Sequence, residues 1–231
     1  MQNLSNGEYA GAADDVRHVS ASSAKAIWVA AALHAGADLS DIARPIFRDS
    51  NNELSGVAID RAGGPDAVND FMWNTVGMER SLLATWFAGR KASNQGQMGG
   101  DNYFTAKDNV KFLSRLDRGE LLDAAKTSTL ETYMTWSPRS GYGGWLGTLL
   151  PAEAQSTMMH KSGWLPRSAY PTYATMNEIG IVQVPGGDRY AVSILARHGV
   201  DYDGAQRSFV ERASCVIYRT IAKDGALGCR D

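Results

Sequence analysis

The pattern of apolar positions changes about two thirds of the way along this chain of 231 residues. In the first part, apolar residues recur at the spacing of an α-helix, which predicts helices over 25–34, 39–47, 53–61, 65–73, 105–116 and 122–136. In the last part, Val and Ile gather in short runs, which predicts strands over 160–164, 179–184 and 190–196. A helix over 205–221 closes the chain.

Glycine, proline and serine mark the segments between these elements. Residues 88–101 and 140–147 are rich in Gly and predict loops. The run Pro185-Gly186-Gly187-Asp188 predicts the hairpin turn between the last two strands. Glu8-Tyr9-Ala10 is a further candidate strand near the front. Three serines, Ser20, Ser22 and Ser23, offer caps for the first helix.

The order of these elements predicts the fold class. Helices fill the middle of the chain and strands come late, which indicates an α+β fold, an α/β sandwich in which helices flank an antiparallel sheet. We expect one domain, 1–231. Its helical subdomain, about 26–150, is inserted into an α/β subdomain made of 1–25 and 151–231.

Composition and charge exclude several classes of protein. Apolar residues make up 44% and charged residues 21%, which argues against disorder. The net charge is −2 and no Lys/Arg block is present, so the sequence lacks the basic patch that is typical of nucleic-acid-binding proteins. The longest apolar stretch, 26–33, is far shorter than the roughly 20 residues of a membrane span. Residues 1–7 carry no signal-peptide pattern, which leaves the compartment open.

One candidate for chemistry is Ser22-Ser23-Ala24-Lys25, a Ser-x-x-Lys at the start of a helix. The i,i+3 spacing places both side chains on one face, so the lysine amine can reach the Ser22 hydroxyl. The helix N-terminus disfavours a cation, and a neutral amine can activate a serine. Alone the motif is weak, because a capping serine beside a solvated lysine is the commoner arrangement.

Two further motifs are also weak when taken singly. Lys161-Ser162-Gly163 lies on a predicted strand, where the glycine lets a substrate backbone approach and the two side chains can hold a carboxylate. Ser50-Asn51-Asn52 begins a predicted helix, and a capping serine is the alternative explanation. The combination of all three motifs, in this order and on these elements, is much more specific.

The ordered motifs resemble those of the serine β-lactamase and penicillin-binding-protein superfamily, and the chain is most similar to class A β-lactamases. The likeness extends from about Gly7 to Arg219 and includes the runs "DLSDIARPIFRDSNN", "AGGPDAVNDFM", "FTAKDNVKFLSRLDRGELLD" and "NEIGIVQVPGGDRYAVSILARHG". It implies a β-lactamase/transpeptidase-like fold.

The resemblance also implies roles for individual residues. Ser22 would be the acylated nucleophile, Lys25 its base or part of the proton relay, and Ser50 the group that passes the proton to the leaving nitrogen. The substrate would be held by Asn52, Lys161, Ser162, Gly163 and Trp164. The backbone N–H groups of Ser22 and Trp164 would form the oxyanion hole.

The chain departs from the class A pattern in several places. Ser22 and Ser50 are only 28 positions apart, which predicts that a wall of the cleft is missing. The Glu-Pro-x-Leu-Asn motif, whose glutamate positions the hydrolytic water in class A enzymes, is absent. The carboxylates of the corresponding region are Glu79 and Asp101. Only six residues precede Gly7, whereas the family usually has a helix and a strand there.

These features predict a serine hydrolase that forms an acyl-enzyme on Ser22 with a β-lactam or a D-Ala-D-Ala-like amide and deacylates slowly. A non-turnover binding or sensor module for β-lactams or peptidoglycan is the alternative, and an esterase or acyltransferase is a third. We expect no cofactor and no metal, since His18, His34 and His198 lack metal-like spacing. The resemblance implies an exported protein. The sequence leaves open the oligomeric state and the pairing of Cys215 with Cys229.

Overall fold

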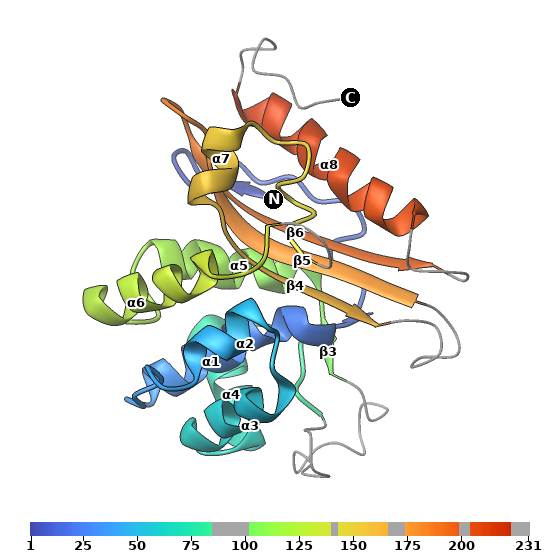
Figure 1. Cartoon of the computed structure of the whole chain (residues 1–231). Coiled ribbons are helices and arrows are strands. Elements are labelled where there is room, and N and C mark those ends of the chain that lie inside the picture. Colours follow the sequence, from blue (N-terminus) through green and yellow to red (C-terminus); the bar gives the residue numbers. More distant parts are fainter. Residues whose placement is uncertain (85–101, 140–142, 166–173, 199–203, 223–231) are drawn as a thin grey trace.

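A four-stranded antiparallel sheet forms the centre of the computed structural model, which describes residues 1–84, 102–139, 143–165, 174–198 and 204–222 (Figure 1). The strand order is β1-β6-β5-β4. The strands are β1 (Gln2–Asn3), β4 (Met159–Leu165), β5 (Ala174–Gln183) and β6 (Arg189–His198). A second, two-stranded sheet joins β2 (His18–Val19) to β3 (Tyr103–Phe104).

One face of the large sheet is covered by α8 (Ala205–Ala222), with α7 (Ala152–Thr157) beside it (Figure 1). Alternate residues of a strand point to opposite faces, so Val192, Ile194 and Ala196 all face this layer. They form an apolar core with side chains of α8 and of the segment before α7.

The other face carries the remaining helices (Figure 1). They are α1 (Lys25–His34), α2 (Ala43–Arg48), α3 (Asn52–Arg61), α4 (Pro65–Asp70), α5 (Ala106–Asp117) and α6 (Ala124–Thr135), with a π-helix, η2 (Phe71–Val76), directly after α4. Nine of the ten residues of α1 are buried, so α1 is the central helix of this layer. The helix α5 packs on β6 and links the layer to the sheet.

The predicted α+β class is confirmed, and the three late strands lie where Val and Ile gather. The predicted strand at Glu8–Ala10 is wrong: only an isolated bridge forms, between Gln2 and Tyr9, and the front strand is β1. The helix α7 was not predicted, because its residues are small and polar. The predicted loop 88–101 lies outside the described residues, as do 140–142. The subdomain limits at 26 and 150 stay a prediction.

A disulfide is attached to the last helix, and the helices have no membrane-spanning character. Cys215 on α8 is disulfide-bonded, and Cys229, the only other cysteine of the sequence, lies outside the described residues. Among the described helices, none is long and apolar enough to cross a membrane.

Candidate active site

Ser22 lies on a short 3-10 helix, η1 (Ala21–Ala24), that leads from β2 into α1. The neighbouring serines use their hydroxyls locally: Ser23 donates to the Ser20 carbonyl at 2.6 Å, and Ser20 donates to the Ala21 carbonyl at 3.3 Å. None of the three caps α1 with its side chain, so the predicted capping is wrong. The half-buried Ser22 hydroxyl donates to no other described residue, which leaves it available to an incoming group.

The backbone before Ser22 is fixed to the sheet by β4 and β5. The side-chain amide of Asn177 donates to the carbonyls of Val19, at 2.7 Å, and Ser20, at 3.2 Å. Gly163 pairs with Asn177 across the strands, and a Cβ on Gly163 would lie only 2.5 Å from the Ser22 nitrogen. The glycine was expected to admit a substrate backbone. Instead it admits the chain's own η1, because any side chain there would collide with it.

Lys25 is the first residue of α1 and is 1% exposed. Its amine donates to the side-chain oxygen of Asn52 at 2.7 Å and to the Ser50 carbonyl, and it lies 3.0 Å from the Ser50 hydroxyl, which can donate to the neutral amine. The amine was expected to reach Ser22. In the structure its hydrogen bonds connect it to Ser50 and Asn52 instead.

Ser50 has a left-handed φ of 53°, a strained conformation that costs a non-glycine residue about 1–3 kcal/mol. It was expected to begin the helix, but Asn51 is the cap and accepts a hydrogen bond from the Leu54 N–H at 2.9 Å. This backbone conformation directs the Ser50 side chain toward the two lysines. Its hydroxyl lies 3.0 Å from the Lys25 amine and 3.2 Å from the Lys161 amine.

The two lysines differ in their electrostatic surroundings. Burial, and then the positive charge of Lys161, lower the pKa of Lys25 to about 6. Burial also lowers the pKa of Lys161, to about 8, against the opposing effect of Glu178. At neutral pH the Lys25 amine is therefore mainly neutral while Lys161 is mainly protonated, so one group can accept a proton and the other can bind an anion.

The remaining predicted residues follow one another on β4, so their side chains alternate between the two faces of the strand. Lys161 and Gly163 face η1 and Ser50, whereas Ser162 and Trp164 point to the opposite face of the strand. A Cβ on Gly143 would come within 2.7 Å of the Ser162 hydroxyl, so Ser162 lies against the segment that begins at Gly143. The structure thus joins Lys25, Ser50, Asn52 and Lys161 by hydrogen bonds. No hydrogen bond connects the Ser162 hydroxyl to them.

Comparisons with known proteins identify the family of the chain. The model of the beta-lactamase enzyme family matches residues 35–221, most of the chain. The chain belongs to this family. No curated protein sequence matches the chain.

The chain also shares its fold with solved structures of β-lactamases and of PBP-A. An acyl-enzyme complex of a PBP-A variant with penicillin-G has a TM-score of 0.76 and 19% identity, covering 96% of this chain and 88% of its own. The TLA-1 extended spectrum β-lactamase has a TM-score of 0.78 and 16% identity, covering 95% and 90%. A representative of class A from Bacteroides cellulosilyticus DSM 14838 has a TM-score of 0.73 and 18% identity, covering 91% and 86%.

This beta-lactamase-family site has a buried polar layer behind β4 that sequence reasoning missed. Nδ1 of His160 lies 2.6 Å from the Glu178 carboxylate, and neither side chain is exposed. The same carboxylate accepts hydrogen bonds from the N–H groups of Gly144, at 3.1 Å, and Leu146, at 2.9 Å. Among the residues that the structure describes, Nε2 of His160 has no hydrogen-bond partner. The signal was present in the polar pair Asn177-Glu178 within an otherwise apolar strand.

Glu79, the described one of the two carboxylates considered as replacements for the missing glutamate, forms an ion pair at the surface. The Glu79 side chain is 80% exposed and pairs with Lys111 at 3.5 Å, and Asp101 lies outside the described residues. Among the residues that the structure describes, no three His, Cys, Asp or Glu side chains are grouped to hold a metal ion.

Proposed function

We propose that this beta-lactamase-family protein is a serine hydrolase that forms an acyl-enzyme on Ser22 with a β-lactam or a D-Ala-D-Ala-like amide. The observation that carries the proposal is the buried Lys25 amine. It has a pKa of about 6 and lies next to the Ser50 hydroxyl, which also contacts the amine of Lys161. A lysine that is neutral at pH 7 is a base, and a structural surface lysine is not. The PBP-A complex with penicillin-G supports the same chemistry by likeness of fold.

In the proposed acylation step, the neutral Lys25 amine takes the proton from the Ser22 hydroxyl while the oxygen attacks the substrate carbonyl. The N–H groups of Ser22 and Trp164 stabilise the resulting oxyanion, each contributing about 3 kcal/mol to lowering the barrier. The carbon–nitrogen bond then breaks, and Ser50 passes the proton from Lys25 to the leaving nitrogen. Ser50 suits this relay because its hydroxyl lies within 3.0 Å of the Lys25 amine.

Substrate recognition would use the charged and amide groups around this relay. Lys161, mainly protonated at neutral pH, attracts the substrate carboxylate. For Ser162 to assist, its hydroxyl would have to reach the substrate from the other face of β4, beside Gly143. Asn52 is exposed at the start of α3, so its amide can reach the amide side chain of the substrate. Trp164 would contribute its backbone N–H, because its side chain packs on the other face of β4 against the apolar core beside α8.

We also propose that the acyl-enzyme is hydrolysed slowly. The Glu-Pro-x-Leu-Asn motif is absent, and Glu79 points to solvent. The same observation favours one second function, a β-lactam or peptidoglycan sensor that does not turn over. Export is part of the proposal, because the disulfide of Cys215 suits an oxidising compartment.

Intact-mass spectrometry with benzylpenicillin tests the acyl-enzyme. The wild type should gain the mass of one penicillin, and Ser22→Ala should gain none. Ser156→Ala, which changes an exposed serine of α7, is the matched control and should react like the wild type. An unmodified wild type, or an equal adduct on Ser22→Ala, would contradict the proposal.

Turnover separates the two functions and the esterase alternative. Slow but Ser22-dependent nitrocefin hydrolysis supports the hydrolase, whereas an adduct that persists without turnover supports the sensor. Ser22-dependent cleavage of aryl esters without any penicillin adduct would favour the esterase.

A further inference from the structure

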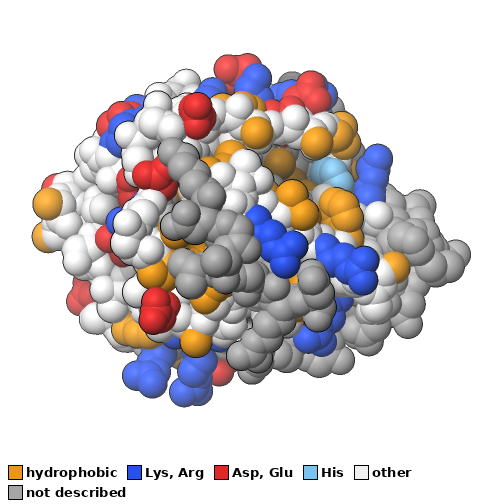
Figure 2. Space-filling model, turned by 90° about the horizontal axis from the view of Figure 1, so that it is seen from above, with side chains coloured by type: hydrophobic (Ala, Val, Ile, Leu, Met, Phe, Trp, Pro, Cys, Tyr) orange, Lys and Arg blue, Asp and Glu red, His pale blue; other side chains and the backbone are white. Residues whose placement is uncertain are grey.

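A carboxylate lies fully buried beneath the α8 layer, on the strand next to β4. Acidic side chains that are visible on the α8 side of the molecule are scattered over its surface (Figure 2), whereas the Glu178 side chain is 0% exposed. Nδ1 of His160 lies 2.6 Å from this carboxylate, and the N–H groups of Gly144 and Leu146 donate to it. A buried carboxylate needs such donors, and an opposite charge nearby stabilises it further.

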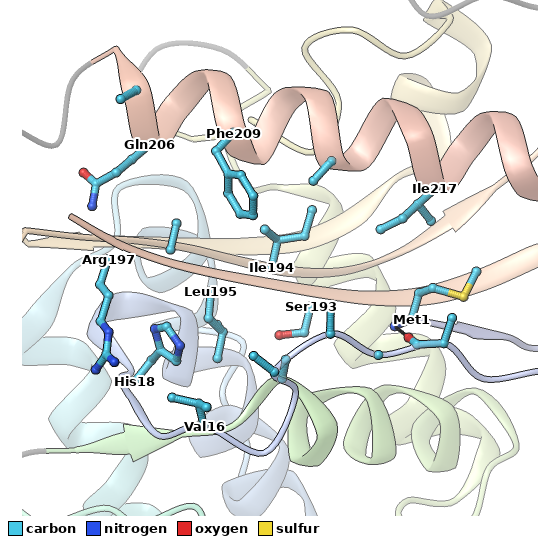
Figure 3. Close-up of a pocket in the computed structure, with 18 residues that line it drawn as sticks. Met1, Val16, His18, Ser193, Ile194, Leu195, Arg197, Gln206, Phe209 and Ile217 are labelled. Carbon is cyan, nitrogen blue, oxygen red and sulfur yellow. Dashed lines mark hydrogen bonds between the residues drawn. The ribbon is translucent and has the colours of Figure 1, made fainter.

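The register of the sheet fixes the face on which Glu178 lies. Glu178 pairs with Ile194 of β6 on one side and with Ser162 of β4 on the other. Figure 3 shows the Ile194 side chain directed toward α8 and that of Leu195 directed away from it. Directly opposed residues of neighbouring strands share a face, so Glu178 and Ser162 also face the α8 layer. Lys161, one position before Ser162, has its side chain on the other face.

The Lys161 amine is nevertheless held close to the position of the carboxylate along the sheet. It donates to the Ser162 carbonyl at 2.7 Å, and Ser162 is the residue directly opposed to Glu178. Side chains opposed in this way start about 5 Å apart. Burial lowers the pKa of Lys161 to about 8, and the negative charge of Glu178 opposes that fall. The carboxylate therefore favours the charged form of the amine.

Other titratable groups around Lys161 act differently. Lys25 of α1 is a like charge when it is protonated, and its pKa is lowered in turn by Lys161. His160 precedes Lys161 on β4, and its ring points toward the buried carboxylate. On α6, which packs on β4, Glu131 is paired with Arg189 at 2.8 Å. Among the described residues, the buried carboxylate is thus the acid that favours a charged Lys161.

The same carboxylate fixes the segment that lies against Ser162. A Cβ on Gly143 would come within 2.7 Å of the Ser162 hydroxyl. Gly144 has a φ of 76°, a left-handed conformation that glycine adopts without strain. The two oxygens of Glu178 accept one hydrogen bond each from Gly144 and Leu146, so the acid holds this segment at β4.

We propose that Glu178 is a positioning residue for an anion site on β4: it holds the 143–146 segment against Ser162 and stabilises the positive charge of the Lys161 amine through the sheet. The anion is the carboxylate of a β-lactam or of a D-Ala-D-Ala-like peptide, and this assignment rests on the proposed function. Glu178 does not contact the substrate itself, because its side chain is fully buried.

NMR titration of Lys161 in the full chain tests the charge coupling without a substrate. The Cε carbon signal of Lys161, assigned by its loss in Lys161→Met, should titrate with a midpoint near pH 8. Glu178→Gln and Glu178→Met both remove the negative charge, so the midpoint should fall by about one pH unit in each. Glu178→Asp keeps the charge and should stay near the wild type. Glu153→Gln, which changes an exposed acid of α7, is the matched control and should leave the midpoint unchanged.

Binding of benzylpenicillin and of its methyl ester separates this role from a merely structural one. The Ser22→Ala background is used, because it cannot form the proposed acyl-enzyme. At pH 8 a midpoint one unit lower reduces the charged fraction of Lys161 from about a half to about a tenth, so Glu178→Gln should weaken benzylpenicillin binding about fivefold. At pH 6 Lys161 stays charged in both proteins, and the loss should be about twofold or less. The methyl ester has no carboxylate and should bind both proteins equally.

Three results would overturn the inference. They are an unchanged Lys161 midpoint in both charge-removing variants, an equal loss of benzylpenicillin binding at pH 6 and pH 8, and a loss of methyl-ester binding as large as that of the acid. None of these depends on acylation. If the wild type takes up no penicillin in the mass-spectrometric test while its Lys161 midpoint still falls in Glu178→Gln, the proposed acyl-enzyme is contradicted and the coupling of Glu178 to Lys161 is supported.

Discussion

Two strands of the sheet, β4 and β6, differ in the groups that they bury. At β4, the buried amines of Lys25 and Lys161 converge on one hydroxyl, that of Ser50. At β6, the side chains of Val192, Ile194 and Ala196 pack instead into the apolar core beside α8.

The difference teaches which costs the fold accepts and where. Burying Lys25 and holding Ser50 at a left-handed φ both oppose folding, and such costs gather where chemistry occurs. No residue of β6 has a left-handed φ. We therefore expect substitutions at β4 to change reactivity, and substitutions at β6 to change stability.

The largest effect should come from Lys25→Met. Removing the amine takes away the proposed base, so the rate of penicillin acylation should fall by about 10³-fold or more. The thermal midpoint should hold or rise, because a buried amine is replaced by an apolar side chain of similar length. Stopped-flow acylation and thermal unfolding measure the two quantities.

The pH dependence of stability gives the control for that variant. Burial lowers the pKa of Lys25 from 10.5 to about 6, so between these values the unfolded chain binds a proton that the folded chain lacks. The free energy of unfolding should then rise with pH in this window, and more steeply for the wild type than for Lys25→Met. Parallel curves would show that Lys25 is not neutral in the folded protein.

Gly163→Ala should come next in size. Its Cβ would lie 2.3 Å from the Ser23 nitrogen, so η1 must move away from β4. We expect acylation to fall about 100-fold, as a shift of about 1 Å at a reactive group can cause, and unfolding to become easier by about 1–3 kcal/mol. Gly187→Ala in the hairpin turn is the control, because its Cβ would meet a Val184 methyl at 3.3 Å. Equal activity of both variants would show that Gly163 does not position Ser22 for the reaction.

Glu178→Gln tests the buried layer behind β4. The amide has one oxygen where the carboxylate has two, so an N–H of Gly144 or Leu146 loses its acceptor. We expect a loss of about 1–3 kcal/mol in unfolding free energy and faster amide exchange at these two residues. Unchanged exchange would mean that the carboxylate does not hold this segment.

Ser50→Gly should change stability only slightly, in the direction opposite to that of Gly163→Ala and Glu178→Gln. Glycine adopts a φ of 53° without strain, so the variant should be more stable by about 1 kcal/mol in chemical denaturation. Acylation should nevertheless slow, because the proton relay is lost. A less stable variant would show that the Ser50 hydroxyl contributes more to folding than the strained backbone costs.

The sequence predicted the fold further than the site. Spacing and β-branched runs located the long helices and strands, because burial itself produces those patterns. The turn of Ser50 away from the α3 cap, and the contact of Gly163 with η1, depend on segments far apart in sequence. The His160–Glu178 layer was missed for the same reason, since a polar pair inside a strand does not reveal its partners.

The rate of benzylpenicillin acylation as a function of pH tests the central claim most directly. If Lys25 is the base, the rate should rise with a midpoint near pH 6 as the amine loses its proton, and should decline above about pH 8 as Lys161 loses its charge. In Lys25→Met the lower limb should disappear along with most of the rate. A wild-type rate that is flat from pH 5 to 7, or that rises only near pH 10, would contradict a neutral Lys25.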